Sequence, residues 1–308
     1  MTGVQTCALP ICSYAYALLR WFRFLHDQLT AWERAERVDV RVFVEHLRDI
    51  PNPQRLRRPA DGPLPGSVNP RTGKTVLGEH YAARTINHQL SVLFGFYEHV
   101  CAVGWGPVVN PVPAQRARGG GRLAAHHNPM EDFVLHRRAN YRQKTPRPVW
   151  RAIPDDAAEQ LFGALRCHRD RALVAFWLSS GVRAAELLGL HHPDLDVGAR
   201  TITVVSKGSR ARETVPASVD SFAWLALYLA EQRPPLIEHG PVWWTRTTPP
   251  RPLTYHAARA VLQRANSALG TNWTLHDLRH TAAQRMLADP GFTLVDVQTI
   301  LRHASVTT

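Results

Sequence analysis

The stretch TLHDLRHTAAQRML, residues 274–287, joins the beginning of a helix to a histidine and an arginine. Thr274 and Asp277 fit the capping-box pattern Thr-x-x-acid, with Asp in place of Glu, so we expect a helix to begin here. His276 and Arg279 then share one face of its first turn. Together they suit a phosphate, because a guanidinium offers a planar fork of donors and an imidazole adds a donor or a proton relay. The apolar residues of the stretch face another way, toward a core: Leu278, Ala282 and Met286.

A second stretch, SGVRAAELLGL at residues 180–190, places an arginine directly after a glycine turn. Gly181 suits the left-handed residue that closes a helix, and Arg183 opens the next helix. Glu186 follows one turn later and can hold Arg183 by an ion pair. Since R-x-x-E is common on helices, this pair indicates a functional site only in combination with the other polar residues.

Two further residues complete the candidate set. The segments RTITVV and ARETVPA alternate apolar and polar residues on both sides of a glycine-containing turn, which predicts a β-hairpin with Lys207 at its tip. His303 follows an apolar helical pattern that ends at Leu301. Either residue alone would be an ordinary surface group, so the set has to be judged as a whole.

The chain divides by pattern into two blocks and a linker. Residues 13–112 form an all-helical block, whose first helix has apolar residues at Tyr16, Leu19, Phe22 and Leu25. Residues 113–151 are basic and rich in glycine and proline, which fits a linker that either follows a phosphate backbone or is simply solvated. Residues 152–308 combine helices with the hairpin. The predicted fold is mainly α with a small antiparallel β-sheet, an α+β domain after a helical one.

Composition narrows the class of partner. The 308 residues carry a formal charge of +12, which favours a polyanion such as nucleic acid. No apolar run is long enough to span a bilayer, so no membrane partner is expected. The four cysteines are scattered, which favours a reducing cytoplasm over a zinc or disulfide framework. His276 and His280 have the spacing of a zinc protease motif, but Asp replaces its glutamate base and Arg279 would bring a cation to the metal.

The order and spacing of five residues resemble the catalytic set of the tyrosine recombinase family, the phage-integrase-type site-specific DNA recombinases: Arg183, Lys207, His276, Arg279 and His303. The strings GVRAAELLGL, HDLRHTAAQRML and ILRHASVTT look like the family's first-arginine motif, its histidine-to-second-arginine motif and the segment before its nucleophile. The helical block is similar, by pattern alone, to the family's core-binding domain. In place of Arg302 the family often has glycine, and we expect this change to be tolerated at a helix end.

The resemblance implies an enzyme that exchanges DNA strands without metal or other cofactor. A tyrosine would attack a phosphate, form a 3′-phosphotyrosyl link and free a 5′-hydroxyl. Arg183 and Arg279 would stabilise the charge of the transition state, with Glu186 behind Arg183. The resemblance assigns protonation of the leaving oxygen to Lys207, help with proton transfer to His276 and a hold on the phosphate to His303.

Family architecture further implies a homotetramer on two double-stranded DNA sites in a prokaryotic cytoplasm. Candidates for additional DNA contacts are basic residues of the first block and of the hairpin: Arg84, His88, Arg210 and Arg212. The rival interpretation is a non-catalytic DNA-binding protein, either a regulator or a decayed integrase, which would share the basic charge but would not need the five residues in this order.

Both ends of the sequence raise expectations of their own. The family's nucleophilic tyrosine lies farther beyond the histidine than this chain extends, and Tyr255 is the last tyrosine present. We therefore expect a C-terminal truncation and no strand cleavage by this fragment. Residues 1–11 resemble a translated sequencing adapter, so residues 1–12 are expected to be an artefact or disordered.

Overall fold

The computed structural model describes residues 5–53, 62–113, 140–145, 151–206, 210–232 and 239–302. Contacts between residues divide the chain into two units. The first consists of Met1–Ser67 and Val76–Arg147, and the second consists of Val68–Thr75 and Pro148–Thr308. The short segment Val68–Thr75 therefore belongs to the second unit, although its neighbours in sequence on both sides belong to the first.

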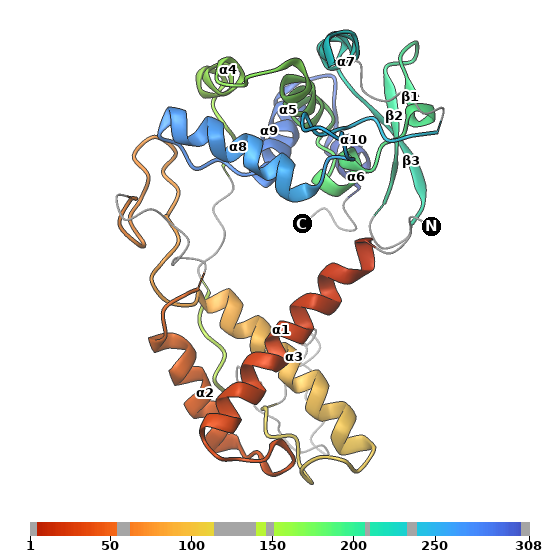
Figure 1. Ribbon diagram of the computed structural model, residues 1–308. Helices are drawn as coiled ribbons and strands as arrows, with labels where there is room; N and C mark the ends of the chain where they lie inside the picture. Colours follow the sequence, from red (N-terminus) through yellow and green to blue (C-terminus); the bar gives the residue numbers. More distant parts are fainter. Residues whose placement is uncertain are drawn as a thin grey trace, which may run out of the picture. The chain divides into compact units, whose positions relative to one another are not determined.

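The first unit is helical, and α1 crosses α3 within it (Figure 1). Its helices are α1 (Gln5–Asp27), α2 (Arg37–Asp49) and α3 (Ala83–Ala102), with a short 3-10 helix at Trp32–Arg34. The core contains large rings that are fully buried, among them Trp21, Phe43 and Tyr97. The indole Nε1 of Trp21 donates a hydrogen bond to the hydroxyl of Tyr97 across 2.9 Å, which satisfies the polar atom of a buried indole.

The predicted first helix is present as α1, and its buried face contains only part of the apolar pattern. Tyr16 is 66% exposed and Leu19 is 41% exposed, whereas Leu25 is buried and Phe22 packs beside the core. The reason is that Trp21, the largest ring of the helix, is directed inward, which turns the neighbouring stripe outward. The helix begins at Gln5, inside the segment predicted to be an artefact or disordered.

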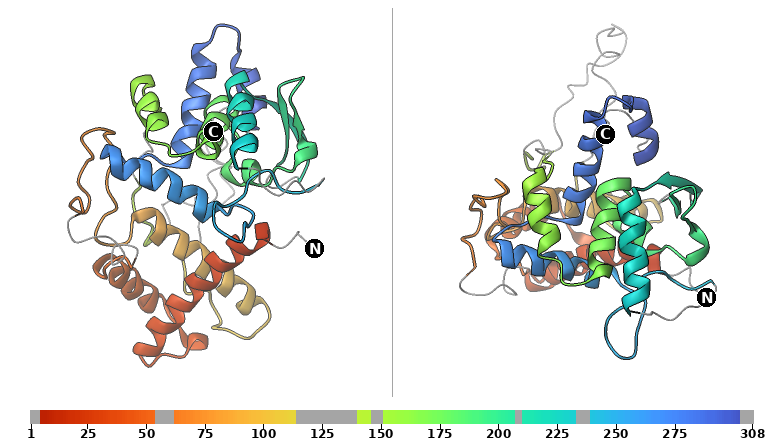
Figure 2. Two further views of the ribbon diagram at one scale, coloured as in Figure 1. Left: turned by 45° about the horizontal axis from the view of Figure 1, so that its top comes forward. Right: turned by 90° about the horizontal axis from the view of Figure 1, so that it is seen from above.

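The second unit consists mainly of helices, with a small sheet at one edge (Figures 1 and 2). Its helices are α4 (Asp155–Gly163), α5 (His168–Ser180), α6 (Ala184–Leu188), α7 (Val219–Gln232), α8 (Tyr255–Leu269), α9 (Leu275–Ala288) and α10 (Leu294–Leu301), with a 3-10 helix at His192–Asp194. The strands are β1 (Leu195–Asp196), β2 (Thr201–Val205) and β3 (Arg212–Pro216). The fold is thus mainly α with a small antiparallel sheet, as the sequence predicts.

The sheet has the order β1-β2-β3 with antiparallel pairing. The β2–β3 pair is the predicted hairpin, with Thr201 opposite Pro216 and Val205 opposite Arg212. Ile202, Val204 and Val215 are buried while their neighbours along the strands are more exposed, which is the period-two pattern of a half-buried sheet. The strand β1 is too short to give such a pattern, and the sequence did not predict it.

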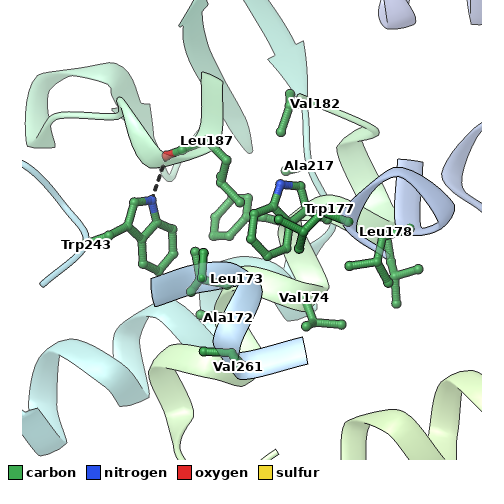
Figure 3. Packing of buried hydrophobic residues seen from close by; sticks show 14 of the residues in the cluster. Ala172, Leu173, Val174, Trp177, Leu178, Val182, Leu187, Ala217, Trp243 and Val261 are labelled. Atoms are coloured by element: carbon green, nitrogen blue, oxygen red, sulfur yellow. Dashed lines mark hydrogen bonds between the residues drawn. The ribbon is translucent and has the colours of Figure 1, made fainter. Parts of the chain in front are cut away.

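Helix α5 lies at the centre of the second unit and contacts α7 and α9. Nearly all of its side chains are buried, because helices surround it on several sides. Leu173 and Trp177 belong to the packed cluster shown in Figure 3. In the same cluster, the indole of Trp243 donates a hydrogen bond to the carbonyl of Leu187 at 2.8 Å, which connects the core to α6 (Figure 3).

The predicted helix boundaries near the site are confirmed. In α9 the carboxylate of Asp277 accepts the backbone N–H of Thr274 at 2.7 Å, and Thr293 with Asp296 repeats this arrangement in α10. Gly181 ends α5 with a left-handed φ of 61°. A Cβ at Gly181 would lie 2.6 Å from a methyl carbon of Leu301, so this glycine also allows the end of α5 to approach α10.

Among the described residues, none of the helices has the length and apolar character needed to cross a membrane.

Candidate active site

Arg279 is a buried residue on α9 that contacts two other elements. Its Nη1 donates to the carbonyl of Gly181 at 2.6 Å, and its Nη2 donates to the carbonyl of Leu301 at 2.5 Å. Hydrogen bonds from a charged donor are about twice as strong as neutral ones. The guanidinium therefore fixes the turn after α5 and the end of α10 against α9.

Arg183 and Glu186 form the predicted pair at the beginning of α6. The Nη1 of Arg183 donates to Oε1 of Glu186 at 2.8 Å, and the backbone N–H of Arg183 donates to Oε2 at 2.8 Å. The side chain of Glu186 is 2% exposed and that of Arg183 is 35% exposed. The carboxylate is thus the buried anchor, while one face of the guanidinium stays open to a ligand.

Arg302 brings a second guanidinium to the same carboxylate. Its Nη2 lies 2.5 Å from Oε2 of Glu186, and its Nε lies 3.5 Å from the carboxylate of Glu213 on β3. The contact places the end of α10 next to α6, as seen in Figure 1. Arg302 has a left-handed φ of 53°, the conformation that a glycine adopts freely. The sequence predicted only that it would be tolerated, and its part in this cluster was missed.

The arginine cluster, defined here as Arg183, Arg279 and Arg302 around Glu186, carries excess positive charge. Glu186 is its buried carboxylate, and Glu213 is a partly exposed second one. Burial, together with the charge of Arg183, lowers the pKa of Arg279 to about 10. Burial by itself would raise the pKa of Glu186, but its hydrogen bonds from Arg183 and the charge of Arg302 lower the pKa overall. An anion bound here would offset the repulsion among the guanidiniums.

His276 is exposed in the first turn of α9, one turn before Arg279. Its ring meets that of His280 edge to face, with centroids 4.1 Å apart. Partial burial lowers the pKa of His276, and the charge of Arg279 adds to this effect. The imidazole is therefore mostly neutral near pH 7 and can accept a proton. No metal-binding group of three or more His, Cys, Asp or Glu side chains occurs among the described residues.

Two residues of the predicted set, Lys207 and His303, lie outside the described residues. Their flanking positions are described: Ser206 follows β2, and Arg302 ends α10. The structure thus brings Arg183, Glu186 and Arg279 together, while the positions of Lys207 and His303 stay predictions.

The four additional DNA-contact candidates are exposed. His88 on α3 shares a 3.0 Å hydrogen bond with the hydroxyl of Ser13. Arg212 on β3 forms an ion pair with Asp194 at 2.5 Å. Arg84 lies on the first turn of α3, and Arg210 precedes β3 with a left-handed φ of 57°. Their proposed contacts with DNA stay predictions.

Comparison with known sequences identifies the relationship. The sequence model described as "Phage integrase family" matches residues 151–308, the part that contains the arginine cluster and α9. The chain belongs to the phage integrase family. The match covers the sheet and every helix from α4 to α10, so it agrees with the resemblance drawn from the five polar residues.

Curated relatives of this integrase-family chain are tyrosine recombinases. The XerC protein of Azotobacter vinelandii is 33% identical over 237 residues, which are 74% of this chain and 68% of that protein. The XerC protein of Chlamydia caviae is 30% identical over 142 residues, 46% of this chain and 45% of that protein. The XerD protein of Lacticaseibacillus casei is 31% identical over 145 residues, 46% of this chain and 48% of that protein. The chain spans about half the length of most of these relatives.

Solved structures show that the fold is shared. XerH bound to a palindromic difH substrate is 16% identical, with a TM-score of 0.62 over 97% of this chain and 74% of that one. A lambda integrase (75-356) dimer bound to a COC′ core site is 15% identical, with a TM-score of 0.61 over 99% of this chain and 90% of that one. At these identities the likeness establishes the fold alone.

Proposed function

We propose that this integrase-family protein is a site-specific DNA recombinase that cleaves and rejoins strands through a 3′-phosphotyrosyl intermediate. The arginine cluster is the observation that carries the proposal. Two guanidiniums from separate parts of the chain, Arg183 and Arg302, pair with one buried carboxylate, and the guanidinium of Arg279 is held nearby by backbone carbonyls. A mostly neutral imidazole lies one turn before Arg279 on α9. A phosphodiester needs both features, because its transition state gathers negative charge while protons move on and off the reacting oxygens.

The arginines would act by holding charge that develops in the transition state. Arg183 has an open face and a backbone fixed by Glu186, so it needs little reorganisation when the phosphate arrives. Arg279 is fixed by two backbone carbonyls and retains further N–H donors for a non-bridging oxygen. A preorganised donor of this kind stabilises a transition state by about 3 to 4 kcal/mol.

Proton transfer would involve the remaining residues of the set. The tyrosine oxygen attacks phosphorus as the P–O5′ bond breaks, so the tyrosine loses a proton and the 5′-oxygen gains one. His276 has the protonation state of an acceptor, which suits assistance to the attacking hydroxyl. By resemblance, Lys207 would protonate the 5′-oxygen and His303 would hold the phosphate. Religation reverses these transfers, and the phosphotyrosyl bond conserves the energy of the broken one.

The proposed partner is double-stranded DNA, and the proposed assembly is a homotetramer on two sites. The charge of +12 supports a polyanionic partner. The structures of XerH and of the lambda integrase fragment contain DNA sites, and the lambda structure is described as a dimer, which supports recognition of duplex DNA in an assembly of several protomers.

The decisive experiment compares two polypeptides. One is the 308-residue chain, in which Tyr255 is the last tyrosine, and the other continues along the reading frame after the Thr308 codon. A duplex enriched from a random pool by binding to the chain is nicked so that a cleaved strand cannot be rejoined. We expect both polypeptides to shift this duplex, and only the longer one to form a covalent adduct that survives denaturation.

Substitution provides the control. In the longer polypeptide, Arg279→Ala should slow adduct formation by about 100-fold to 1000-fold while the duplex is still shifted. The outcome that contradicts strand cleavage is a longer polypeptide that contains a tyrosine, binds the duplex tightly and never forms an adduct. That result would identify a non-catalytic DNA-binding protein instead.

A further inference from the structure

A small hairpin from the first half of the sequence belongs to the second unit. Its sequence is VNPRTGKT, residues 68–75, and a bridge between Val68 and Thr75 closes it. The side-chain oxygen of Asn69 accepts the backbone N–H groups of Arg71 and Thr72 at 2.9 and 3.1 Å, which is the local bonding that makes Asn favourable in turns. The hairpin is thus built by its own sequence.

Gly73 allows the hairpin to fit closely against the rest of the unit. Its φ is 62°, in the left-handed region, and a Cβ there would lie 2.2 Å from Nη1 of Arg151. That same Nη1 donates to the carbonyl of Thr72 at 3.0 Å. Any larger residue at position 73 would displace this guanidinium.

Polar contacts fasten the hairpin to the segment directly before α9. Asn69 donates to the carbonyl of Gly270 at 2.9 Å, and the hydroxyl of Thr72 donates to the side-chain oxygen of Asn272. The amide of Asn272 in turn donates to the carbonyl of Lys74 at 3.4 Å. These contacts bring Lys74 to the first turn of α9.

Lys74 forms an ion pair with Asp277 there. The side chains of Lys74 and Asp277 are only 22% and 11% exposed, so the ammonium contacts this carboxylate and has little contact with solvent. The same Oδ2 of Asp277 accepts the backbone N–H and the hydroxyl of Thr274, both at 2.7 Å. Asp277 therefore holds both the helix start and the hairpin, and it is adjacent in sequence to His276.

We propose that Lys74 is a positioning residue for His276, acting through Asp277 to fix the first turn of α9. The role in strand cleavage rests on the proposed function, whereas the coupling between Lys74 and His276 does not. The segment thus contributes to the active site from outside the stretch that carries the family motifs, since residues 68–75 precede the matched residues 151–308.

The charges around His276 predict the direction in which its pKa should shift when Lys74 or Asp277 is replaced. The charged and titratable groups near its ring are Asp277, Arg279 and His280 on α9, and Lys74 from the hairpin. Burial and Arg279 lower the pKa of His276, Asp277 opposes them, and Lys74 lowers it further. Removing the lysine charge should therefore raise the pKa of His276 toward its ordinary value, and removing the aspartate charge should lower it.

The test is an NMR titration of the full 308-residue chain, following the ring proton and carbon signals of its histidines. The signal of His276 is assigned by its loss in His276→Gln. We expect Lys74→Met to raise the pKa of His276, Lys74→Arg to restore the wild-type value and Asp277→Asn to lower it. The matched control is Arg71→Met, which removes one positive charge from an exposed position of the same hairpin and should leave the titration unchanged.

Opposite shifts show that the Lys74–Asp277 pair acts on His276 in a first turn that stays folded, since unfolding of that turn would move the pKa of His276 toward its ordinary value in both variants. The proposal is overturned if Lys74→Met is folded, as judged by circular dichroism, and the pKa of its His276 equals that in the wild type and in Arg71→Met. If Lys74→Met does not fold, the Lys74→Arg and Asp277→Asn variants decide, and an unchanged or raised pKa in Asp277→Asn would overturn the proposal.

A second measurement distinguishes this inference from the proposed function. In the longer polypeptide, the pH profile of adduct formation should move upward in Lys74→Met and stay in place in Arg71→Met. If the pKa of His276 shifts in Lys74→Met but the longer wild-type polypeptide forms no adduct, strand cleavage is refuted and the coupling between Lys74 and His276 stands. Robust cleavage with an unshifted profile and titration would refute the coupling alone.

Discussion

Two buried arginine–carboxylate clusters in the second unit use the same chemistry to different ends. In the first, Nε and Nη2 of Arg169 donate hydrogen bonds to the same oxygen of Asp170, at 2.9 and 2.6 Å. The Nη1 of Arg169 donates to the carbonyl of Trp244 at 2.9 Å. Both side chains are 6% exposed, and the two charges balance. In the second, the arginine cluster, Arg183 and Arg302 pair with the buried Glu186, and Arg279 lies within electrostatic range of both Arg183 and Glu186.

The difference separates a structural ion pair from a prepared anion site. The Arg169 pair is closed, because its charge is balanced and its guanidinium is bonded on each nitrogen. The arginine cluster keeps an excess of positive charge and a guanidinium that is 35% exposed. Its stability and its function should therefore respond to anions, whereas the Arg169 pair should not.

The largest expected effect tests the closed pair. Asp170→Ala would leave Arg169 buried without a counter-charge, a change that costs about 3 to 5 kcal/mol of unfolding free energy. Urea unfolding of the 308-residue chain measures this loss, and added sulfate should not restore it. A loss below about 1 kcal/mol would mean that Arg264, 4.0 Å from Asp170, or solvent plays a larger part than the balanced pair implies.

The next effect concerns the open cluster. In the longer polypeptide, Arg279→Ala should reduce the rate of adduct formation on the nicked duplex by about 100-fold to 1000-fold, as expected for a lost transition-state donor. Arg169→Ala is the matched control, since it removes a buried arginine from the other cluster. In the fraction that stays folded, it should cleave at nearly the wild-type rate. Equal losses of rate in both variants would contradict the claim that the arginine cluster, and not the Arg169 pair, acts in strand cleavage.

A smaller effect separates the backbone of Arg302 from its charge. Arg302→Gly removes an ion pair with Glu186 but suits the left-handed φ, while Arg302→Ala removes the same ion pair and keeps the backbone strain. The alanine variant should be less stable than the glycine variant by roughly 1 kcal/mol in urea unfolding. Equal stabilities would show that the backbone at residue 302 relaxes without the guanidinium.

The smallest effect is the response to acid. The pKa of Glu186 is lower in the folded chain than its ordinary value, so its ion pairs stabilise the fold above pH 4.5, and this stabilisation is lost as the pH falls through the folded pKa. Because burial opposes the hydrogen bonds, the net contribution is modest. Unfolding measured between pH 6 and pH 3 should depend less on pH in Glu186→Gln, and identical slopes would exclude this role of Glu186.

Local signals accounted for the parts that the sequence predicted well. Thr274 and Thr293 begin helices because their side chains and the acid three residues later satisfy backbone groups within one turn. Gly181 ends a helix because it adopts the left-handed conformation without a Cβ. The Arg183–Glu186 pair also lies within one turn, so the spacing was enough to predict it.

The contacts that were missed join residues far apart in the chain. Arg302 meets Glu186 across 116 positions, and Lys74 meets Asp277 across 203. The exposure of Tyr16 and Leu19 on α1 also depends on a distant contact, because the position of Trp21 against α3 decides which side of the helix is buried. None of these partners leaves a local pattern, although the departure from glycine at position 302 was a visible signal.

The sequence by itself determined the helix ends, the β2–β3 hairpin, the basic charge and the order of the cationic residues, since each depends on neighbours within a few positions or on composition. Only the tertiary structure decided that Arg302 joins the arginine cluster, that Arg279 is held by two distant carbonyls, and that the hairpin of residues 68–75 reaches α9. The physical reason is that ion pairing and burial depend on distance in space, which becomes fixed when the core around α5 packs.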